Sequence, residues 1–141
     1  MNASSKILLV GGSGTLGKPT AQLLVKAGYP LRLMTRYPEK VGNFRSAEME
    51  ILKGDLIDSD SLKIACEGMD LVIAMAHSLL GVGKYRSAKV DVKGHKSLID
   101  IAKSAGVKFF VYISVVGAGA NQTIDFWRNK FEVEQYLQHS G

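Results

Sequence analysis

Short apolar runs alternate with amphipathic segments along the whole chain. Five of the runs are apolar nearly throughout instead of alternating with polar residues, which predicts strands buried on both faces of a sheet. We expect these strands at residues 6–10, 31–35, 49–53, 71–76 and 109–114, and helices at residues 16–27, 60–67, 86–104 and 125–139. Residues 38–47 fit either a short helix or a loop.

The regular succession of strands and helices predicts an α/β protein. Strands joined through helices run parallel, with right-handed crossovers and helices on both faces of the sheet. In the first helix, the stripe expected to face the sheet consists of Leu16, Thr20, Leu23, Leu24 and Ala27. In the long helix it consists of Gly94, Leu98, Ile101, Ala102 and Ala105.

The length and composition indicate one folded domain. The chain has 141 residues, and its 46% apolar and 22% charged residues exclude a disordered chain. Cys66 is the only cysteine, which excludes a disulfide framework and a multi-cysteine zinc site and is consistent with a reducing compartment. No apolar run approaches the roughly 20 residues that cross a bilayer, and no signal-peptide core precedes the first strand. We therefore expect a cytoplasmic protein without a membrane segment or a metal site.

The charge balance indicates an anionic partner. The formal net charge is +5, but the Lys and Arg residues are scattered and are not interleaved with aromatic residues, which argues against a nucleic-acid module. A phosphorylated small molecule fits the same charge and has more support from local motifs.

The strongest motif is a glycine-rich turn between the first strand and the first helix. It comprises Gly11, Gly12, Ser13, Gly14, Thr15, Leu16 and Gly17. One glycine permits the tight turn, one lets the main chain approach a diphosphate, and Gly17 lets the helix pack closely on the strand. The N-terminus of the helix adds unpaired N–H groups and a partial positive charge. The alternative, a turn that binds nothing, is disfavoured by this position.

The end of the second strand indicates which dinucleotide binds. An NAD-preferring site usually has a carboxylate there, bonded to the ribose 2′-hydroxyl, whereas this strand ends in Thr35-Arg36. The guanidinium of Arg36 suits a 2′-phosphate, and Lys40 adds a second positive charge. We therefore favour NADP(H) over NAD(H), with a solvated surface arginine as the open alternative.

Two further strand ends reach the same edge of the predicted sheet. Asp55 follows the third strand, where it can accept a hydrogen bond from an adenine amino group or simply stabilise a turn. Ala76 and His77 follow the fourth strand, where small residues let the chain pass close to a bound cofactor. From its position alone, His77 is better explained as a histidine in a loop without a ligand.

In combination, these residues resemble the NmrA-like branch of the atypical short-chain dehydrogenases/reductases. The resemblance rests on the glycine-rich turn and on the runs Met34-Thr35-Arg36, Gly54-Asp55-Leu56, Val90-Asp91-Val92-Lys93-Gly94 and Val111-Tyr112-Ile113-Ser114. It implies a Rossmann-type doubly wound sheet of order 3-2-1-4-5 that binds NADP(H). The glycines would hold the diphosphate, Arg36 the 2′-phosphate, and Asp55 with Leu56 the adenine, while Ala76 and His77 would lie along the cofactor and Ser114 beside the nicotinamide.

The same resemblance assigns Lys130 to the lysine of the Tyr-x-x-x-Lys pair, but Phe126 stands at the tyrosine position. Phenylalanine has no proton to donate, so the usual hydroxyl acid is missing. Lys130 also interrupts a stripe formed by Phe126, Val133 and Leu137, so its charged end needs either a polar partner or an extended path to solvent.

Two functions follow as expectations. The first is an NADPH-dependent reductase of a small carbonyl, quinone or related substrate, with Lys130 and Ser114 as the candidate catalytic residues. The second is a non-catalytic NADP(H) sensor that acts through a regulatory protein partner. In the resembling family more strands follow, so we expect an incomplete domain whose apolar last strand, residues 109–113, lies at an edge and favours homo-oligomers.

Overall fold

The computed structural model describes residues 5–42, 46–77 and 88–141. Its centre is a sheet of five parallel strands in the order β3-β2-β1-β4-β5, as expected for a doubly wound protein. The strands are β1 (Ile7–Val10), β2 (Leu31–Thr35), β3 (Met49–Lys53), β4 (Leu71–Ala74) and β5 (Phe109–Tyr112). Val10 pairs with Met34 on one side and Ala74 on the other, so three strands end at the same level.

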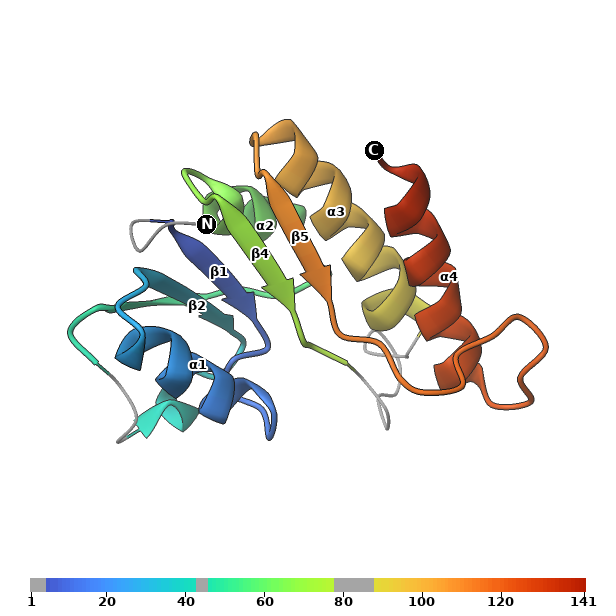
Figure 1. Ribbon diagram of the computed structural model, residues 1–141, viewed down its shortest axis with the longest axis horizontal. Helices are drawn as coiled ribbons and strands as arrows, with labels where there is room; N and C mark the ends of the chain where they lie inside the picture. Colours follow the sequence, from blue (N-terminus) through green and yellow to red (C-terminus); the bar gives the residue numbers. More distant parts are fainter. Residues whose placement is uncertain (1–4, 43–45, 78–87) are drawn as a thin grey trace.

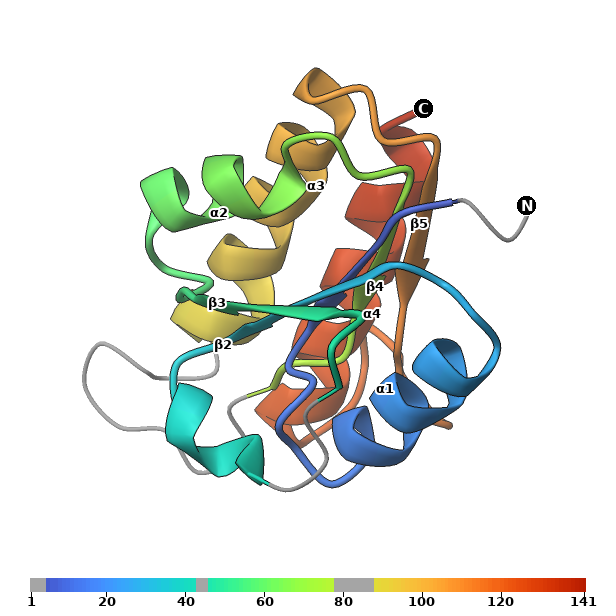
Figure 2. The same ribbon diagram turned by 90° about the vertical axis from the view of Figure 1, so that its left-hand side faces the viewer.

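Helices cover both faces of this sheet (Figures 1 and 2). One face carries α1 (Gly17–Lys26), and the other carries α2 (Ser59–Cys66), α3 (His95–Ser104) and α4 (Asp125–His139). Residues Pro38–Lys40 form a short 3₁₀ helix, η1. Of the two alternatives for residues 38–47, a short helix is therefore correct at the start of this stretch. The expected Rossmann-type α/β class is therefore confirmed.

The long helix begins differently from the prediction. Ala88–Gly94 form a π-helical segment, η4, which leads directly into α3, and Arg86 and Ser87 lie outside the described residues. Gly94 packs against Leu56, where an added Cβ would lie 2.9 Å from the Leu56 Cβ. Val90 and Asp91 of this segment are buried, and Val90 also lines the pocket described below.

The sheet-facing stripe predicted for α1 is correct only in part. Leu24 packs against the core and Thr20 is half-buried, but Leu23 is 67% exposed and Leu16 is 57% exposed. The buried residues of the helix are Gly17 and Ala21, whose small size lets α1 lie close to the sheet. The stripe on α3 is better predicted, since Leu98 and Ala102 are buried.

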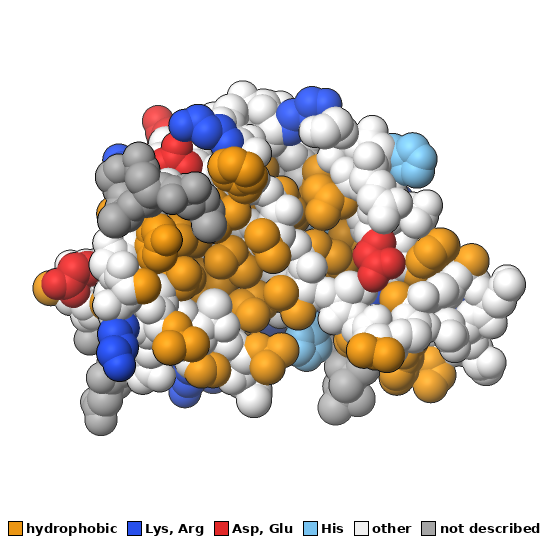
Figure 3. All heavy atoms as spheres, viewed as in Figure 1, with side chains coloured by type: hydrophobic (Ala, Val, Ile, Leu, Met, Phe, Trp, Pro, Cys, Tyr) orange, Lys and Arg blue, Asp and Glu red, His pale blue; other side chains and the backbone are white. Residues whose placement is uncertain are grey.

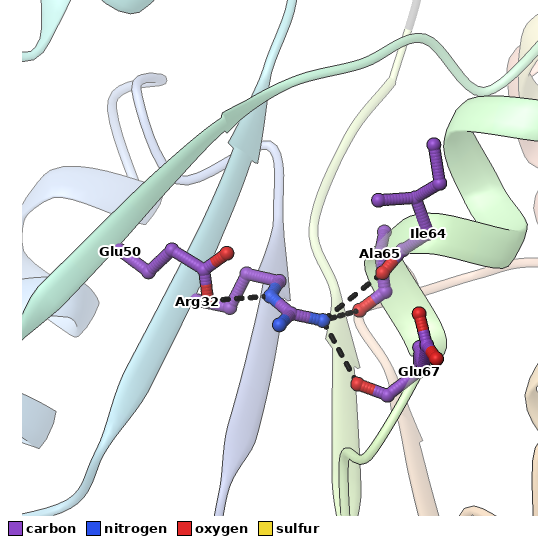
Figure 4. Close-up of polar contacts among 5 residues, drawn as sticks. All are labelled: Arg32, Glu50, Ile64, Ala65 and Glu67. Carbon is purple, nitrogen blue, oxygen red and sulfur yellow. Dashed lines mark hydrogen bonds and ion pairs between the residues drawn. The ribbon is translucent and has the colours of Figure 1, made fainter.

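Arg32 connects two strands to the end of a helix (Figure 4). Its Nε donates to Glu50 of β3 at 2.7 Å. Its Nη1 donates to three carbonyls at the C-terminus of α2, those of Ile64, Ala65 and Glu67, at 2.9–3.0 Å. A single side chain thus satisfies carbonyls that a helix end leaves without intrahelical partners.

The last strand is only half covered. Phe110 and Tyr112 pack on the core beneath α3, whereas Phe109 and Val111, on the face that carries α1, are 54% and 43% exposed. They pair with Leu71 and Ile73 of β4, and Figure 3 shows apolar side chains gathered on this face. The expectation that every strand is buried on both faces therefore fails for β5, because α1 lies over β1 and β2 and does not extend across this face to β5.

Candidate functional site

The glycine-rich turn leaves β1 at the centre of the sheet. Gly11 has a φ of +86°, a conformation that costs other residues free energy. A Cβ on Gly17 would lie 2.3 Å from the carbonyl oxygen of Gly11, so the first turn of α1 packs this closely only with glycine. Gly14 is exposed, and the carbonyl of Gly11, at 3.3 Å, is the one neighbour that an added Cβ would meet among the described residues. Main chain is therefore accessible at the start of the helix, as anion-binding turns require.

A pocket of about 170 Å³ opens over the carboxyl ends of β1 to β4. It brings together many of the residues selected from sequence, namely Gly11, Ser13, Gly14, Arg36, Asp55, Leu56, Ala76 and His77. The other selected residues do not line it, and these are Gly12, Thr15, Leu16, Gly17, Lys40, Ser114 and Lys130. Gly12 and Gly17 are buried and shape the turn from behind.

The fourth strand ends two residues earlier than predicted because the chain passes over the glycine-rich turn. A Cβ added to Gly11 would lie only 2.6 Å from the backbone nitrogen of Ala76. The two small residues thus permit a close crossing of two loops, as the sequence indicates for this position.

Asp55 lies at the pocket wall and also stabilises its own turn. Its Oδ1 accepts a hydrogen bond from the N–H of Ile57 at 3.2 Å, and its own N–H donates to Ser61 Oγ at 3.1 Å. The residue that caps α2 is Asp58, whose side chain accepts from the N–H of Asp60. Asp55 therefore has the turn role considered from its sequence position, while remaining on the pocket surface.

Lys130 is buried next to the end of β5, in a cluster of polar side chains that does not line the pocket. Only 3% of the residue is exposed, its Nζ donates to the Ile113 carbonyl at 2.8 Å, and its Nζ lies 4.5 Å from the centroid of the Tyr112 ring. An extended path to solvent is therefore wrong for this lysine. Its polar partner here is a backbone carbonyl, and its contact with a cofactor ribose stays a prediction. β5 ends at Tyr112, before the predicted residue 114, because its partner strand β4 ends opposite, at Ala74.

Burial and neighbouring charges shift the pKa values of the side chains around Lys130. Burial lowers the pKa of Lys130, while the nearby negative charge of Asp91 on η4 acts in the opposite direction. Burial, followed by the charge of Lys130, lowers the pKa of His95 to about 4, so its ring is neutral at pH 7. Burial also raises the pKa of Tyr112, whose ring lies edge-on to His95 at 5.1 Å.

Three buried polar atoms near Lys130 have no hydrogen-bond partner among the described residues. They are His95 Nε2, the Tyr112 hydroxyl and Ser114 Oγ. The Nδ1 of His95 lies 3.2 and 3.1 Å from the carbonyls of Val90 and Asp91, which places the ring proton on Nδ1. Unsatisfied groups of this kind destabilise a fold, and they concentrate at functional sites.

Phe126 joins the pocket to the buried lysine. Its ring is 6.1 Å from that of His77, which lines the pocket, and the Nζ of Lys130 lies 5.8 Å from its centroid. Phe126, at the tyrosine position, thus contacts both His77 and Lys130, but its ring carries no hydroxyl.

Sequence reasoning missed several residues of the site. Tyr37, Met75 and Val90 line the pocket, and His95 lies in the buried group. Tyr37 directly follows Arg36 and Met75 directly precedes Ala76, so the positions next to the selected residues at the strand ends would include both. Val90 and His95 enter from a helix far along the chain, and only the tertiary structure brings them here.

In the ranges 5–42, 46–77 and 88–141, no group of three or more His, Cys, Asp or Glu residues is arranged to hold a metal ion. Within the same ranges, none of the helices combines the length and apolar character needed to cross a membrane.

The open parallel sheet, the glycine-rich turn after its first strand and the pocket over the strand ends define a Rossmann-type protein. The chain belongs to the NmrA-like family, whose sequence profile matches residues 3–141. The resemblance stated from the motifs is thereby confirmed.

Three similar proteins illustrate the range of this family and its neighbours. The chain is 30% identical over 137 residues to the photosystem II assembly factor Ycf39 of Cyanophora paradoxa, covering 96% of this chain and 42% of that protein. It is 31% identical over 135 residues to an NAD(P)H azoreductase of Xenophilus azovorans, covering 96% and 44%. An NADPH-dependent quinone oxidoreductase of Escherichia coli, solved with NADPH, superposes with a TM-score of 0.77 at 26% identity, covering 96% and 45%. The chain thus spans less than half the length of these relatives.

Proposed function

We propose that the pocket over the strand ends binds NADP(H). The observation that carries this proposal is the combination of an exposed main-chain turn with cationic side chains at the end of β2. Gly11 and Gly17 hold the turn in a shape that an added Cβ would fill, and Gly14 leaves it accessible. Arg36 lines the same pocket and replaces the carboxylate that NAD-preferring sites usually have.

The proposed contacts follow the pocket from one end to the other. Residues Gly11, Gly12, Ser13, Gly14, Thr15, Leu16 and Gly17 would contain the diphosphate site, and Arg36 with Lys40 would bind the 2′-phosphate. Asp55 and Leu56 would contact the adenine, Ala76 and His77 would lie along the cofactor, and Ser114 and Lys130 would serve its nicotinamide end. The azoreductase and the quinone oxidoreductase use the same class of cofactor according to their names.

We further propose that the chain is part of an NADPH-dependent reductase of a small carbonyl, quinone or related compound. The cofactor would supply the hydride. Lys130 supports this activity because a lysine held in an apolar stripe at a cost in solvation is typical of a functional position. Its positive charge would orient the cofactor and polarise a carbonyl oxygen of the substrate.

A specific observation supports the second candidate, a non-catalytic NADP(H) sensor with a protein partner. Phe126 occupies the tyrosine position, and its ring contacts both His77 and the Lys130 ammonium. The hydroxyl that would donate a proton is therefore absent from this position.

Stopped-flow measurement of NADPH oxidation with a panel of quinones and carbonyls distinguishes these two candidates. Turnover that is lost in Lys130→Met supports the reductase. Tight NADPH binding without turnover in the longest natural form of the protein supports the sensor. Failure of the wild-type protein to bind NADPH contradicts both candidates.

The compartment and the association state are also proposals. A reducing, cytoplasmic environment is supported by Cys66, a buried thiol whose pKa burial raises to about 11 and which is therefore poorly reactive. Self-association through β5 is supported by the exposed Phe109 and Val111. Ycf39, by its name, functions in photosystem assembly, which gives the protein-partner candidate a precedent among relatives.

A further inference from the structure

Tyr37 lies next to two cations beside the pocket. The residue is 42% exposed and lines the pocket wall. The guanidinium carbon of Arg36 lies 5.2 Å from the ring centroid, and the ammonium of Lys40 lies 4.3 Å from it. Both distances are within the range of cation–π attraction. Two positive side chains that would otherwise repel each other therefore both contact the same aromatic ring.

Backbone hydrogen bonds define the turn that follows Tyr37. Pro38 begins the 3₁₀ turn η1, in which the N–H of Lys40 donates to the Tyr37 carbonyl at 3.0 Å. The N–H of Val41 donates to the Pro38 carbonyl at 3.2 Å, and the Val41 side chain is buried in the core beneath α1. The turn thus carries Lys40 back over the ring and is anchored at its far end.

One buried hydroxyl connects this turn to the glycine-rich turn. Thr35 is 5% exposed, and its Oγ1 accepts a hydrogen bond from the N–H of Tyr37 at 3.1 Å. The same Oγ1 lies 2.7 Å from the Oγ of Ser13, with which it shares a second hydrogen bond. Ser13 belongs to the glycine-rich turn and lines the pocket. The two loops that face the pocket from β1 and β2 are therefore joined through Thr35.

We propose that Tyr37 is a specificity-determining positioning residue, which holds Arg36 and Lys40 together as one site for a phosphomonoester dianion. Thr35 holds that site in register with the glycine-rich turn. This inference rests on the proposed NADP(H) binding and extends it, because it assigns the preference for a 2′-phosphate to an uncharged ring as well as to the cations. Pre-positioned cations lose less side-chain entropy when the dianion binds.

The test compares ligands with and without the 2′-phosphate. NADPH, NADH, 2′,5′-ADP and 5′-AMP are titrated by calorimetry into the wild-type protein, Tyr37→Leu and Tyr37→Phe. We expect Tyr37→Leu to weaken NADPH and 2′,5′-ADP by roughly three- to tenfold, with NADH and 5′-AMP changed by less than about twofold. Tyr37→Phe keeps the ring and is expected to retain the wild-type preference for ligands with a 2′-phosphate.

Other outcomes overturn the inference in recognisable ways. Equal weakening of all four ligands assigns Tyr37 to the adenine, and unchanged binding shows that the ring does nothing for the cations. If the wild-type protein binds none of the four ligands, the proposed function itself is wrong.

The link through Thr35 has its own test. Thr35→Val removes the hydroxyl at nearly constant volume, and Thr35→Ser keeps it. We expect Thr35→Val and Ser13→Ala to weaken NADPH binding non-additively, because both break the same connection. Circular dichroism and urea unfolding check that each variant folds, and strictly additive losses would contradict the coupling.

Discussion

The ammonium of Lys130 donates to the backbone carbonyl of Ile113 at 2.8 Å, well inside the protein. A lysine on the buried stripe of α4 thus finds its partner at the end of β5, seventeen positions earlier in the chain. The next residue, Ser114, has a buried hydroxyl that finds no partner among the described residues. The two residues proposed for the nicotinamide end are therefore neighbours, although neither lines the pocket.

Replacing this lysine separates its binding role from its structural role. Lys130→Met removes a buried charge, which favours folding, and leaves the Ile113 carbonyl unpaired, which opposes it, so we expect a stability change below about 2 kcal/mol. NADPH affinity is expected to fall, while affinity for 2′,5′-ADP, which lacks the nicotinamide half, is expected to stay the same. Calorimetry measures both.

The matched control is Lys63→Met, which removes an exposed lysine on α2 and should leave both affinities unchanged. Equal loss for NADPH and 2′,5′-ADP in Lys130→Met would place the lysine elsewhere in the site.

His95 predicts a loss of stability in acid. Its pKa is about 4 in the folded protein, below the value of 6.5 expected when the chain is unfolded, so the unfolded state takes up the proton first. This contribution to stability is complete above pH 6.5 and is lost as the pH falls toward 4. From pH 8 to pH 5 it amounts to about 2 kcal/mol.

Urea unfolding of the wild-type protein and of His95→Asn over this pH range isolates the contribution of this residue. The exposed His139 provides the control variant His139→Gln, which should follow the wild-type curve. Parallel curves for the wild-type protein and His95→Asn would show that the pKa of His95 does not differ between the folded and unfolded states.

Arg32 predicts a stability effect far from the pocket. Arg32→Leu leaves three carbonyls at the end of α2 without their donor and Glu50 without its ion pair, and we expect a loss of about 2–3 kcal/mol. Lys63→Leu breaks an exposed ion pair on the same helix and should cost less than about 1 kcal/mol. Chemical denaturation compares the two, and similar losses would mean that Arg32 contributes no more than a surface charge.

The bare face of β5 predicts self-association at high concentration. Phe109 and Val111 are exposed on a strand that is at the edge of the sheet in the described part of the chain. Phe109→Lys is expected to shift sedimentation velocity profiles toward the monomer. Ile64→Lys, which changes an exposed residue on the opposite side of the sheet, should leave the profile unchanged. A wild-type protein that is monomeric at all concentrations would contradict the proposed association.

Local sequence patterns predict the helices, strands and turns better than they predict the tertiary contacts of these elements. The glycine-rich turn and the stripe of Phe126, Lys130 and Val133 follow from spacing alone, because each lies within one or two turns of the chain. The buried face of α1 is predicted only in part, because the choice between Ala21 and Leu23 as the buried residue depends on how closely the helix approaches the sheet. Packing distance is a tertiary property that periodicity does not contain.

The buried group around Lys130 was predictable only in part. Lys130 itself was selected from the sequence, but His95 and Tyr112 read as ordinary members of a helix and a strand. Their rings meet because η4 and α3 cross the end of β5, and the sequence separation between them hides the contact.

Binding of NADPH at the main chain of the glycine-rich turn is the central claim, and Gly14 provides its most direct test. An added Cβ there would meet only the Gly11 carbonyl among the described residues, at 3.3 Å, so Gly14→Val should fold, whereas a side chain at Gly17 would strike the backbone at 2.3 Å. NADPH is titrated into the wild-type protein and Gly14→Val by nucleotide fluorescence, with urea unfolding confirming that both are folded. The account predicts saturable binding to the wild-type protein and none to the variant, and a folded Gly14→Val protein that binds NADPH as tightly as the wild type would contradict it.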